Sequence, residues 1–418
     1  MHSAGARYTA AVGLRAGGPG RLDQTGMPRT PRISWLFAAL ACLPVLYCCS
    51  AYFSRSGKGI DFPEFYSAAR LVGEGFGHRL YDASLQWQFQ ARLTGRVGTL
   101  FNHPPFETLL YLPFSWFPYR LAYLLWSAFN LLLLGLAAWR LRGHLSAPLN
   151  IPTLFLLFLA FPPVTLSLLQ GQDSILLLLA FTTLTRMPGH EREAGLWLGL
   201  GLIKFQFVIP AALILGARRS RPFAAGLAAA GSALLLISVA ISGPAVLLAY
   251  PRFLHSLNGV SLSGIHPYAM PNLRGLCALA FSGSPRAEPA ALLALSVMVF
   301  VLAWNGWRQA AAQRGRTALA VSNTVLAAVL LSYHASPHDL TLLIMPLAIT
   351  FAYLRTMGAR SSRLRMALLV TALALALPPA HVFALRAHCY SLLALAVLVL
   401  FMMTHLEISR PRDAVQTE

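Results

Sequence analysis

The chain has 418 residues, of which 56% are hydrophobic and 11% are charged. The charged share is about half that of a typical soluble domain, and the apolar stretches approach the roughly 20 residues that a bilayer-spanning helix needs. This composition excludes a soluble globular enzyme and indicates an all-α, polytopic integral membrane protein. The 33 Lys and Arg residues outnumber the 14 Asp and Glu residues, but they lie in short turns between apolar stretches. They therefore indicate membrane topology and contact with anionic lipids, not nucleic acid.

Three domains are predicted along the chain. Residues 1–32 are rich in Gly, Arg and Pro, and we expect a disordered cytoplasmic tail because such a segment buries too little apolar surface. A transmembrane domain is expected over 33–406, with about 10–13 membrane helices, and a second cytoplasmic tail over 407–418. The first span is not followed by a small-residue cleavage site and is predicted to remain as an anchor. The predicted spans are 35–53, 121–140, 151–169, 173–187, 222–242, 288–307, 317–334, 338–354, 366–384 and 388–406.

The five cysteines do not indicate a metal or a disulfide framework. Cys42, Cys48 and Cys49 lie in or beside the first span, Cys277 in a long loop and Cys389 in the last span. They lack the paired spacing of zinc sites. We expect most of them to be small buried apolar residues, and no metal or cofactor is predicted.

Residues 194–215 pose a topological problem because Lys204 and Gln206 interrupt an apolar stretch that has arginines on both sides. A charge at the bilayer centre costs about 3 kcal/mol or more unless it is paired or hydrated. If both flanks are cytoplasmic, the stretch must enter and return as two short helices. With that choice the positive-inside rule places both termini in the cytoplasm and loops 54–120 and 243–287 on the outer face of an inner membrane.

The first outer loop is the most polar part of the chain. Asp61, Glu64, Glu74 and Asp82 place four of the 14 acidic residues between Gly57 and Pro105. Apolar residues at helical spacing over 62–72 predict an amphipathic helix along the membrane surface, with Asp61 at its N-cap. Asp61 is therefore either a catalytic carboxylate or only a helix cap. Residues 104–118 are too short to cross the membrane and are expected to lie in the interface or to re-enter.

Other polar residues mark possible functional positions. The turn Gln170-Gly171-Gln172-Asp173 joins two apolar stretches, and Asp173 can be functional or can cap the helix that follows. Lys204 needs an anionic partner or a wet cavity, unless its ammonium snorkels to the interface.

A third polar group lies near the C-terminal side. Tyr333, His334, His338 and Asp339 form a cluster that suggests a phosphate or hydroxyl site more than a metal site, because His338 and Asp339 point about 100° apart on a helix. In the second outer loop, Asn272 and Arg274 are polar candidates. Arginine suits bidentate phosphate contact, although a solvated loop arginine is equally common.

Seven short motifs occur in an order that resembles glycosyltransferase family 87, whose members are polyprenyl-phosphate-sugar-dependent enzymes of the type C architecture. The resemblance covers roughly residues 59–350. The motifs are DFPEFYSAARLVGEG, LYD, FNHPPFETLLYLPF, LLQGQDSILLLL, AGLWLGLGLIKFQFVIPAALIL, PNLRGL and SPHDLTLLIMPL. His103, Asp173 and Arg274 depart from the residues that are common at their positions in the family.

The resemblance implies transfer of a hexose, most often mannose, from a polyprenyl-phosphate donor to an extracytoplasmic glycan, lipid or protein acceptor. Asp61 would be the general base, and Lys204, Arg274 and His338 would bind the donor phosphate. The remaining substrate contacts are expected from Glu64, Tyr66, His103, Gln172, Asp173, Asn272 and Asp339. These residue types suit the implied reaction. Its oxocarbenium-like transition state needs a carboxylate to take the acceptor proton and cations to bind the leaving phosphate.

Two alternatives come from other functional classes. A secondary transporter would also have many spans, a mid-membrane Lys204 and acids at helix ends. The two halves of the sequence show no convincing repeat, however, and transporters rarely need a polar loop of about 50 residues after the first span. The second alternative is a non-catalytic membrane subunit that binds lipid or glycan.

Overall fold

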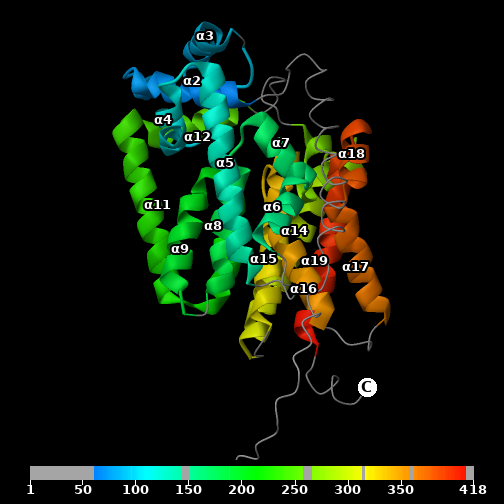
Figure 1. Ribbon diagram of the computed structural model, residues 1–418. Helices are drawn as coiled ribbons and strands as arrows, with labels where there is room; N and C mark the ends of the chain where they lie inside the picture. Colours follow the sequence, from blue (N-terminus) through cyan, green and yellow to red (C-terminus); the bar gives the residue numbers. More distant parts are fainter. Residues whose placement is uncertain are drawn as a thin grey trace, which may run out of the picture.

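The structure is a computed structural model that describes residues 61–95, 97–143, 150–187, 189–257, 266–312, 316–356 and 362–410. These residues are helical and contain no strand, so the all-α prediction is confirmed for them (Figure 1). A bundle of long helices carries a cap of short helices at one end. The predicted N-terminal tail, the first span 35–53 and residues 411–418 of the C-terminal tail lie outside the described residues.

The cap is built from the first outer loop. It consists of α2 (Phe62–Gly73), η1 (Gly77–Arg79), α3 (Ala83–Thr94), η2 (Pro105–Glu107) and α4 (Thr108–Ser115). α2 packs against α3 and α4 and buries nine of its 12 residues. The predicted helix over 62–72 is therefore present as α2, and the neighbouring short helices cover it. Residues 104–118 form η2, α4 and the turn after them, and do not cross the bundle.

The long helices form the bundle, and their apolar side chains make one large core. Its α-helices are α5 (Tyr119–Arg142), α6 (Ile151–Leu159), α7 (Pro162–Gln170), α8 (Ser174–Thr182), α9 (Glu191–Leu200), α10 (Phe205–Leu215), α11 (Arg221–Ser242), α13 (Leu273–Ala280), α14 (Ala287–Ala312), α15 (Thr317–Leu331), α16 (Ile344–Thr356), α17 (Ser362–Ala376), α18 (Pro378–Arg386) and α19 (Leu393–Ser409). α12 (Val246–Ser256) lies at the cap end of the bundle (Figure 1). The 3₁₀ segments are η3 (Thr183–Arg186), η4 (Gly201–Lys204), η5 (Gly216–Arg218), η7 (Pro267–Ala269), η8 (Pro337–Leu343) and η9 (Tyr390–Leu392).

Proline residues break two of the expected spans. Among the described residues, six helical segments are long and apolar enough to cross a membrane, or up to eight if each bent pair counts as one span. α6 and α7 meet at 73°, and α17 and α18 meet at 57°. The second helix of each pair begins with proline, which lacks the N–H that a continuous helix needs. Two further apolar helices, Ser174–Arg186 and Thr317–Leu331, are shorter.

Helices α9 and α10 form a hairpin that returns to its starting face. By length and composition, Glu191–Arg218 passes as a single span. Its ends nevertheless meet, because Arg218 Nη2 lies 3.5 Å from Glu191 Oε1, whereas a straight helix of this length would separate them by about 40 Å. The chain reverses at η4, where Lys204 has non-helical dihedral angles. The stretch thus enters and returns as two short helices, with Lys204 near the turning point.

Glycines allow α9 and α11 to pack with their backbones in contact. A Cβ at Gly195 would lie 2.1 Å from the Phe223 carbonyl oxygen, and one at Gly226 would lie 2.2 Å from the Arg192 carbonyl oxygen. Residue numbers rise together along the contact, so the two helices run parallel. Small residues at such contacts let membrane helices approach closely. This contact holds the hairpin, and therefore Lys204, at a fixed depth.

We expect Gly226→Ala to destabilise the protein, because the backbone of Arg192 cannot give way as a flexible side chain would. Overpacking of this kind costs roughly 1–3 kcal/mol. Gly231→Ala on the same helix is the matched control, because its Cβ would meet only Leu202 Cδ1 at 3.4 Å. Thermal unfolding of the two purified variants in detergent tests this. Equal melting temperatures would contradict the close contact.

Candidate active site

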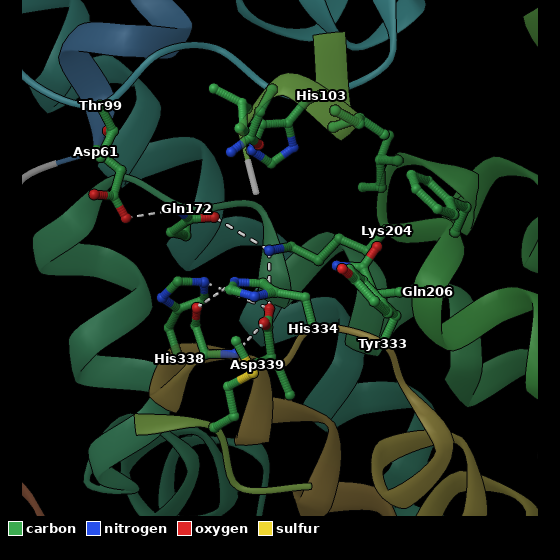
Figure 2. A pocket seen from close by; sticks show the side chains of 18 of the residues that line it. Asp61, Thr99, His103, Gln172, Lys204, Gln206, Tyr333, His334, His338 and Asp339 are labelled. Carbon is green, nitrogen blue, oxygen red and sulfur yellow. Dashed lines mark hydrogen bonds and ion pairs between the residues drawn. The ribbon is translucent and has the colours of Figure 1, made fainter. Parts of the chain in front are cut away.

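A cavity of about 460 Å³ lies between the cap and the bundle. Its walls come from segments far apart in the sequence: the start of α2, residues 99–104, the turn after α7, η4, α12 and residues 333–339. Figure 2 shows that Asp61, Gln172, Lys204 and Asp339 approach one another across it. Tertiary folding therefore gathers polar residues that the sequence separates.

Asp61 precedes α2 but does not cap it. Its side chain makes no capping hydrogen bond, and its carboxylate accepts a hydrogen bond of 2.7 Å from Gln172 Nε2. Its backbone N–H donates to the Gln170 carbonyl oxygen at 3.0 Å, which ties α2 to the turn after α7. Burial raises the pKa of Asp61 to about 6, although the Gln172 hydrogen bond and the charge of Lys204 act to lower it. The geometry excludes the helix-cap explanation for this carboxylate.

The turn after α7 is held rigidly from behind. Gly171 has φ of +72°, a conformation that L side chains rarely adopt. Trp126 Nε1 donates to the Gly171 carbonyl oxygen at 2.8 Å, and Phe62 packs against the glycine so closely that a Cβ there would lie 2.6 Å from Phe62 Cβ. These contacts fix the directions of Gln170 and Gln172 on either side of the glycine.

Lys204 is buried, with 3% of its surface exposed, and three oxygens surround its ammonium. Nζ lies 2.8 Å from Asp339 Oδ1, 3.2 Å from Gln172 Oε1 and 3.3 Å from Asp173 Oδ1. The contact with Asp173 is an ion pair without hydrogen-bond geometry. Asp173 makes no side-chain cap for α8, so its carboxylate serves the ammonium instead. Neither snorkelling nor a helix cap explains these two side chains.

Asp339 is also held by its own segment. It accepts hydrogen bonds from Ser174 Oγ at 2.9 Å and from the Ser336 backbone N–H at 2.8 Å. Ser336 and Asp339 form a capping box at the start of η8. The carboxylate thus faces Lys204 because of both its local structure and a partner on α8.

Two histidines line the wall between the turn and η8. His338 Nδ1 lies 2.6 Å from Gln170 Oε1, and its Nε2 lies 3.5 Å from Asp339 Oδ1. His334 Nε2 lies 3.3 Å from Ser336 Oγ, and its Nδ1 has no partner in the described part of the chain. Burial lowers the pKa of His334 to about 4, so the ring is neutral near pH 7. In the described structure, no group of three or more His, Cys, Asp or Glu residues can hold a metal ion.

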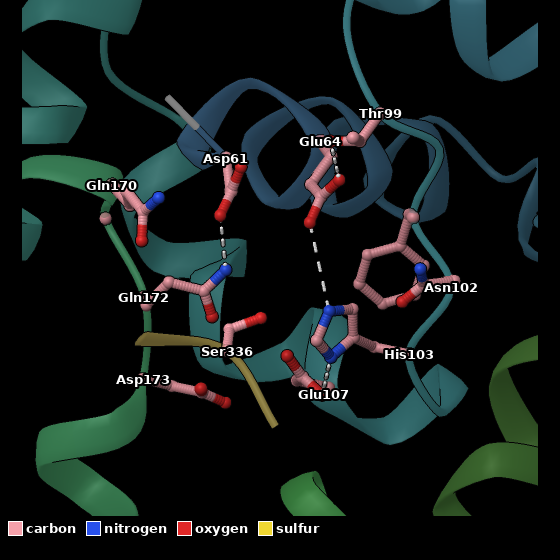
Figure 3. Close-up of polar contacts among 12 residues, drawn as sticks. Asp61, Glu64, Thr99, Asn102, His103, Glu107, Gln170, Gln172, Asp173 and Ser336 are labelled. Atoms are coloured by element: carbon pink, nitrogen blue, oxygen red, sulfur yellow. Dashed lines mark hydrogen bonds and ion pairs between the residues drawn. The ribbon is translucent and has the colours of Figure 1, made fainter. Parts of the chain in front are cut away.

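A second polar chain extends from α2 to η2 (Figure 3). His103 Nε2 lies 3.8 Å from Glu64 Oε1, and His103 Nδ1 lies 3.1 Å from Glu107 Oε2. The other oxygen of Glu64 accepts a short hydrogen bond from Thr99. Burial, reinforced by the nearby Asp61, raises the pKa of Glu64, and burial also raises the pKa of Glu107 well above its ordinary value. Burial lowers the pKa of His103.

Four predicted site residues do not line the cavity. Tyr66 donates from its hydroxyl to the Phe117 carbonyl oxygen at 2.8 Å. Asn272 caps α13 by accepting from the Gly275 N–H at 2.9 Å. Arg274 lies behind Tyr333, with its guanidinium 4.3 Å from the centre of that ring. These positions give Tyr66 and Asn272 structural contacts and leave Arg274 outside the cavity wall. Asp173 also lies behind the wall, where it contacts Lys204.

Sequence reasoning missed Glu107, Thr99 and Ser174 as partners within the site. Glu107 is 1% exposed, and a carboxylate at the start of a short apolar helix carries a burial cost that only polar partners can offset. Its position four residues after His103 was the available signal, because residues four apart meet on a helical turn. Thr99 and Ser174 gave no comparable signal.

We expect Gly171→Ala to unfold at a clearly lower temperature than the parent protein. The substitution adds the left-handed backbone penalty of about 1 kcal/mol and also forces Phe62 to move. Gly75→Ala is the matched control, because Gly75 has φ of +88° but no atom lies within 4 Å of the position that its Cβ would take. If both variants unfold at the same temperature in detergent, Phe62 does not restrain the turn.

Comparison with known proteins adds one match. The family model of glycosyltransferase family 87 matches residues 101–337, which is more than half of the chain. The matched stretch contains the turn after α7, Lys204 and the segment before His338, while Asp61 and α2 precede it. No curated protein and no solved structure matches the chain. The extent of the family match, together with the apolar helices of the bundle, shows that the chain belongs to glycosyltransferase family 87 and is a membrane glycosyltransferase.

Proposed function

We propose that this glycosyltransferase moves a hexose, with mannose as the first candidate, from a polyprenyl-phosphate donor to an extracytoplasmic acceptor. The observation that carries the proposal is the Asp61 carboxylate, which borders the cavity and is held by Gln172 instead of capping α2. A carboxylate in this position can take the proton of an acceptor hydroxyl. The family supplies the reaction class, and the cavity supplies the group that the reaction needs.

In the proposed reaction, the acceptor oxygen attacks the anomeric carbon of the donor sugar while its proton passes to Asp61. The bond between the anomeric carbon and the phosphate oxygen breaks, and the electron pair leaves with the lipid phosphate. One carboxylate suffices for such a single displacement, in contrast to a double displacement through a covalent sugar intermediate. Glu64, with its raised pKa and its contact with Thr99, is a candidate ligand for sugar hydroxyls.

The leaving phosphate needs hydrogen-bond donors on the opposite wall. Lys204 is the only Lys or Arg among the cavity-lining residues that the structure describes, and two carboxylates already neutralise it. Neutral donors are therefore the better candidates. His334 has a ring nitrogen without a partner in the described part of the chain, and His338 lies beside it. Arg274, just behind Tyr333, can contribute positive potential at the rim without touching the phosphate.

The orientation of the helices supports an extracytoplasmic site. Arg140 and Arg142 end α5, Arg221 begins α11 and Arg355 lies in the last turn of α16. These ends lie at the side of the bundle away from the cap (Figure 1). By the positive-inside rule, this distribution of arginines supports a cytoplasmic location for that side and an outer location for the cavity. We propose an inner-membrane location with both termini cytoplasmic on the same grounds.

A donor panel tests the proposed function. Purified protein in detergent or nanodiscs is incubated with polyprenyl-phosphate-linked mannose, arabinose or glucose, and loss of each donor is followed. We expect the mannose-carrying donor to be consumed faster than the other two donors. Turnover of none of the three, together with uptake of a labelled solute into proteoliposomes, would instead support a transporter. Donor binding without turnover would support a non-catalytic subunit.

Asp61→Asn is expected to lower the rate of transfer by about 10²- to 10⁴-fold, because the amide cannot accept the proton. The side chain keeps its shape, so the melting temperature is expected to change little. Transfer at the parental rate would exclude Asp61 as the general base.

The pH dependence gives a further test. A general base acts only when it is ionised, so kcat/KM is expected to fall as the pH drops through the pKa of Asp61, at about 6. The loss therefore lies on the acid side, and the rate should level off above about pH 7. A profile measured with the donor that turns over checks this. A rate that stays constant down to pH 4 would contradict it.

A further inference from the structure

Lys204 occupies a position that the proposed chemistry does not explain. As a phosphate ligand, it would need an N–H that points at the substrate. Instead it is 3% exposed, donates hydrogen bonds to Asp339 and Gln172, and forms an ion pair with Asp173 at 3.3 Å. Two of the three oxygens in these contacts belong to the carboxyl groups of Asp339 and Asp173, which already pair with the ammonium. An incoming phosphate would have to displace Asp339 or Asp173 from a buried ion pair, which is costly.

The third oxygen belongs to Gln172, and it leads back to Asp61. Lys204 Nζ donates to Gln172 Oε1 at 3.2 Å, and Gln172 Nε2 donates to Asp61 Oδ2 at 2.7 Å (Figure 2). An amide has one accepting end and one donating end. Because the ammonium can only donate, it fixes the carbonyl end of Gln172 toward itself and the NH₂ end toward Asp61. Without the ammonium, the amide could turn over and present its oxygen to the carboxylate.

We propose that Lys204 is a positioning residue, which holds Gln172 so that its amide fixes and keeps ionised the Asp61 carboxylate, and that Lys204 does not bind the donor phosphate. This inference rests on the proposed role of Asp61 as the general base. Asp173 and Asp339 are then the counter-charges that keep the ammonium protonated and centred at the turning point of the α9–α10 hairpin.

The sequence supports a requirement for lysine at this position. Of the 33 basic residues, only Lys58 and Lys204 are lysines. The ammonium is a compact point charge with three donors, whereas a guanidinium is a larger planar group. Oxygens of Gln172, Asp173 and Asp339 surround the single nitrogen Nζ. A compact ammonium fits this arrangement, whereas the planar guanidinium of arginine does not. A phosphate ligand, in contrast, could be arginine.

Lys204→Arg and Gln172→Leu test the proposal, with polyprenyl-phosphate mannose as the donor after the donor panel has established turnover. We expect both to lower kcat by about a hundredfold, because a misplaced catalytic group costs a factor of this order, while the donor KM stays within about twofold of the parental value. Gln172→Leu is also expected to move the acid limb of the pH profile to higher pH, because Asp61 loses a hydrogen bond to its ionised form. Gln309→Leu on α14, outside the cavity, is the matched control for loss of an amide.

The double variant distinguishes positioning from phosphate binding. If Lys204 acts through Gln172, Lys204→Arg combined with Gln172→Leu is no slower than the slower single variant, because residues in one chain of contacts are not additive. A many-fold rise in donor KM for Lys204→Arg, with kcat retained, would overturn the proposal. The proposal would also be overturned if the loss of kcat in the double variant equalled the product of the losses in the two single variants.

Two further measurements separate a folding defect, or a failure of the general-base function, from a failure of the positioning role. If Lys204→Arg fails to give monodisperse protein on size-exclusion chromatography, Gln172→Leu decides alone, because it leaves the buried ion pairs intact. Full activity of Gln172→Leu then overturns the proposal. Asp61→Asn is measured in parallel. If that variant is fully active, the general-base function itself fails; if it is inactive while Gln172→Leu is active, only the positioning role fails.

Discussion

The buried ammonium of Lys204 is the constraint around which the site is organised. A charge at this depth is tolerated only with anionic partners, and the fold supplies them from two helices that follow polar turns, Asp173 before α8 and Asp339 in η8. The same ammonium reaches Gln172. Three segments, 170–174, η4 and 336–339, are thereby drawn to one point between the cap and the bundle. The cavity lies where these segments meet.

The hairpin of α9 and α10 explains how a lysine reaches that point. A helix that crossed the whole membrane would place its middle residue among apolar neighbours. A hairpin that reverses at η4 instead brings the reversal, with its non-helical backbone, to the cavity wall. Irregular backbone at membrane depth is tolerated where it lines a cavity or is buried in protein. The glycine contact between α9 and α11 and the ion pair between Glu191 and Arg218 fix the two ends of this arrangement.

The packing of the cap fixes the position of Asp61, the proposed catalytic carboxylate. α2 is surrounded by aromatic side chains, with Phe65 stacked on Tyr111 at 4.5 Å and Tyr111 against Trp126 at 4.2 Å. Trp126 in turn holds the Gly171 carbonyl oxygen. The carboxylate at the start of α2 and the turn that carries Gln172 are therefore parts of one packed unit. Rigid support of this kind limits the motion of a catalytic group and reduces the reorganisation that reaction requires.

Composition and apolar periodicity by themselves determined that this is an all-α, multi-pass membrane protein, because a bilayer demands long apolar helices. The order of short motifs indicated its family. Two arginine-flanked apolar halves around Lys204 predicted the hairpin, since the energetic cost of a buried charge can be estimated without coordinates. Residues 151–169 and 366–384 were predicted as single spans, and the structure corrected this, because each is bent where a second helix begins with proline.

Only the tertiary structure decided what each polar residue touches. Asp61 and Asp173 both stand at N-cap positions, and local sequence could not distinguish a cap from an ion-pair or hydrogen-bond partner on another helix. The spacing of Glu107 from His103 was visible in the sequence, but the burial of Glu107 became apparent only from the packing of η2 in the tertiary structure. Arg274 was expected in the site from its chemistry, yet it lies behind Tyr333. Contacts between residues more than a hundred positions apart, such as Asp61 and Gln172, depend on how helices pack, and periodicity along one helix carries no information about its neighbour.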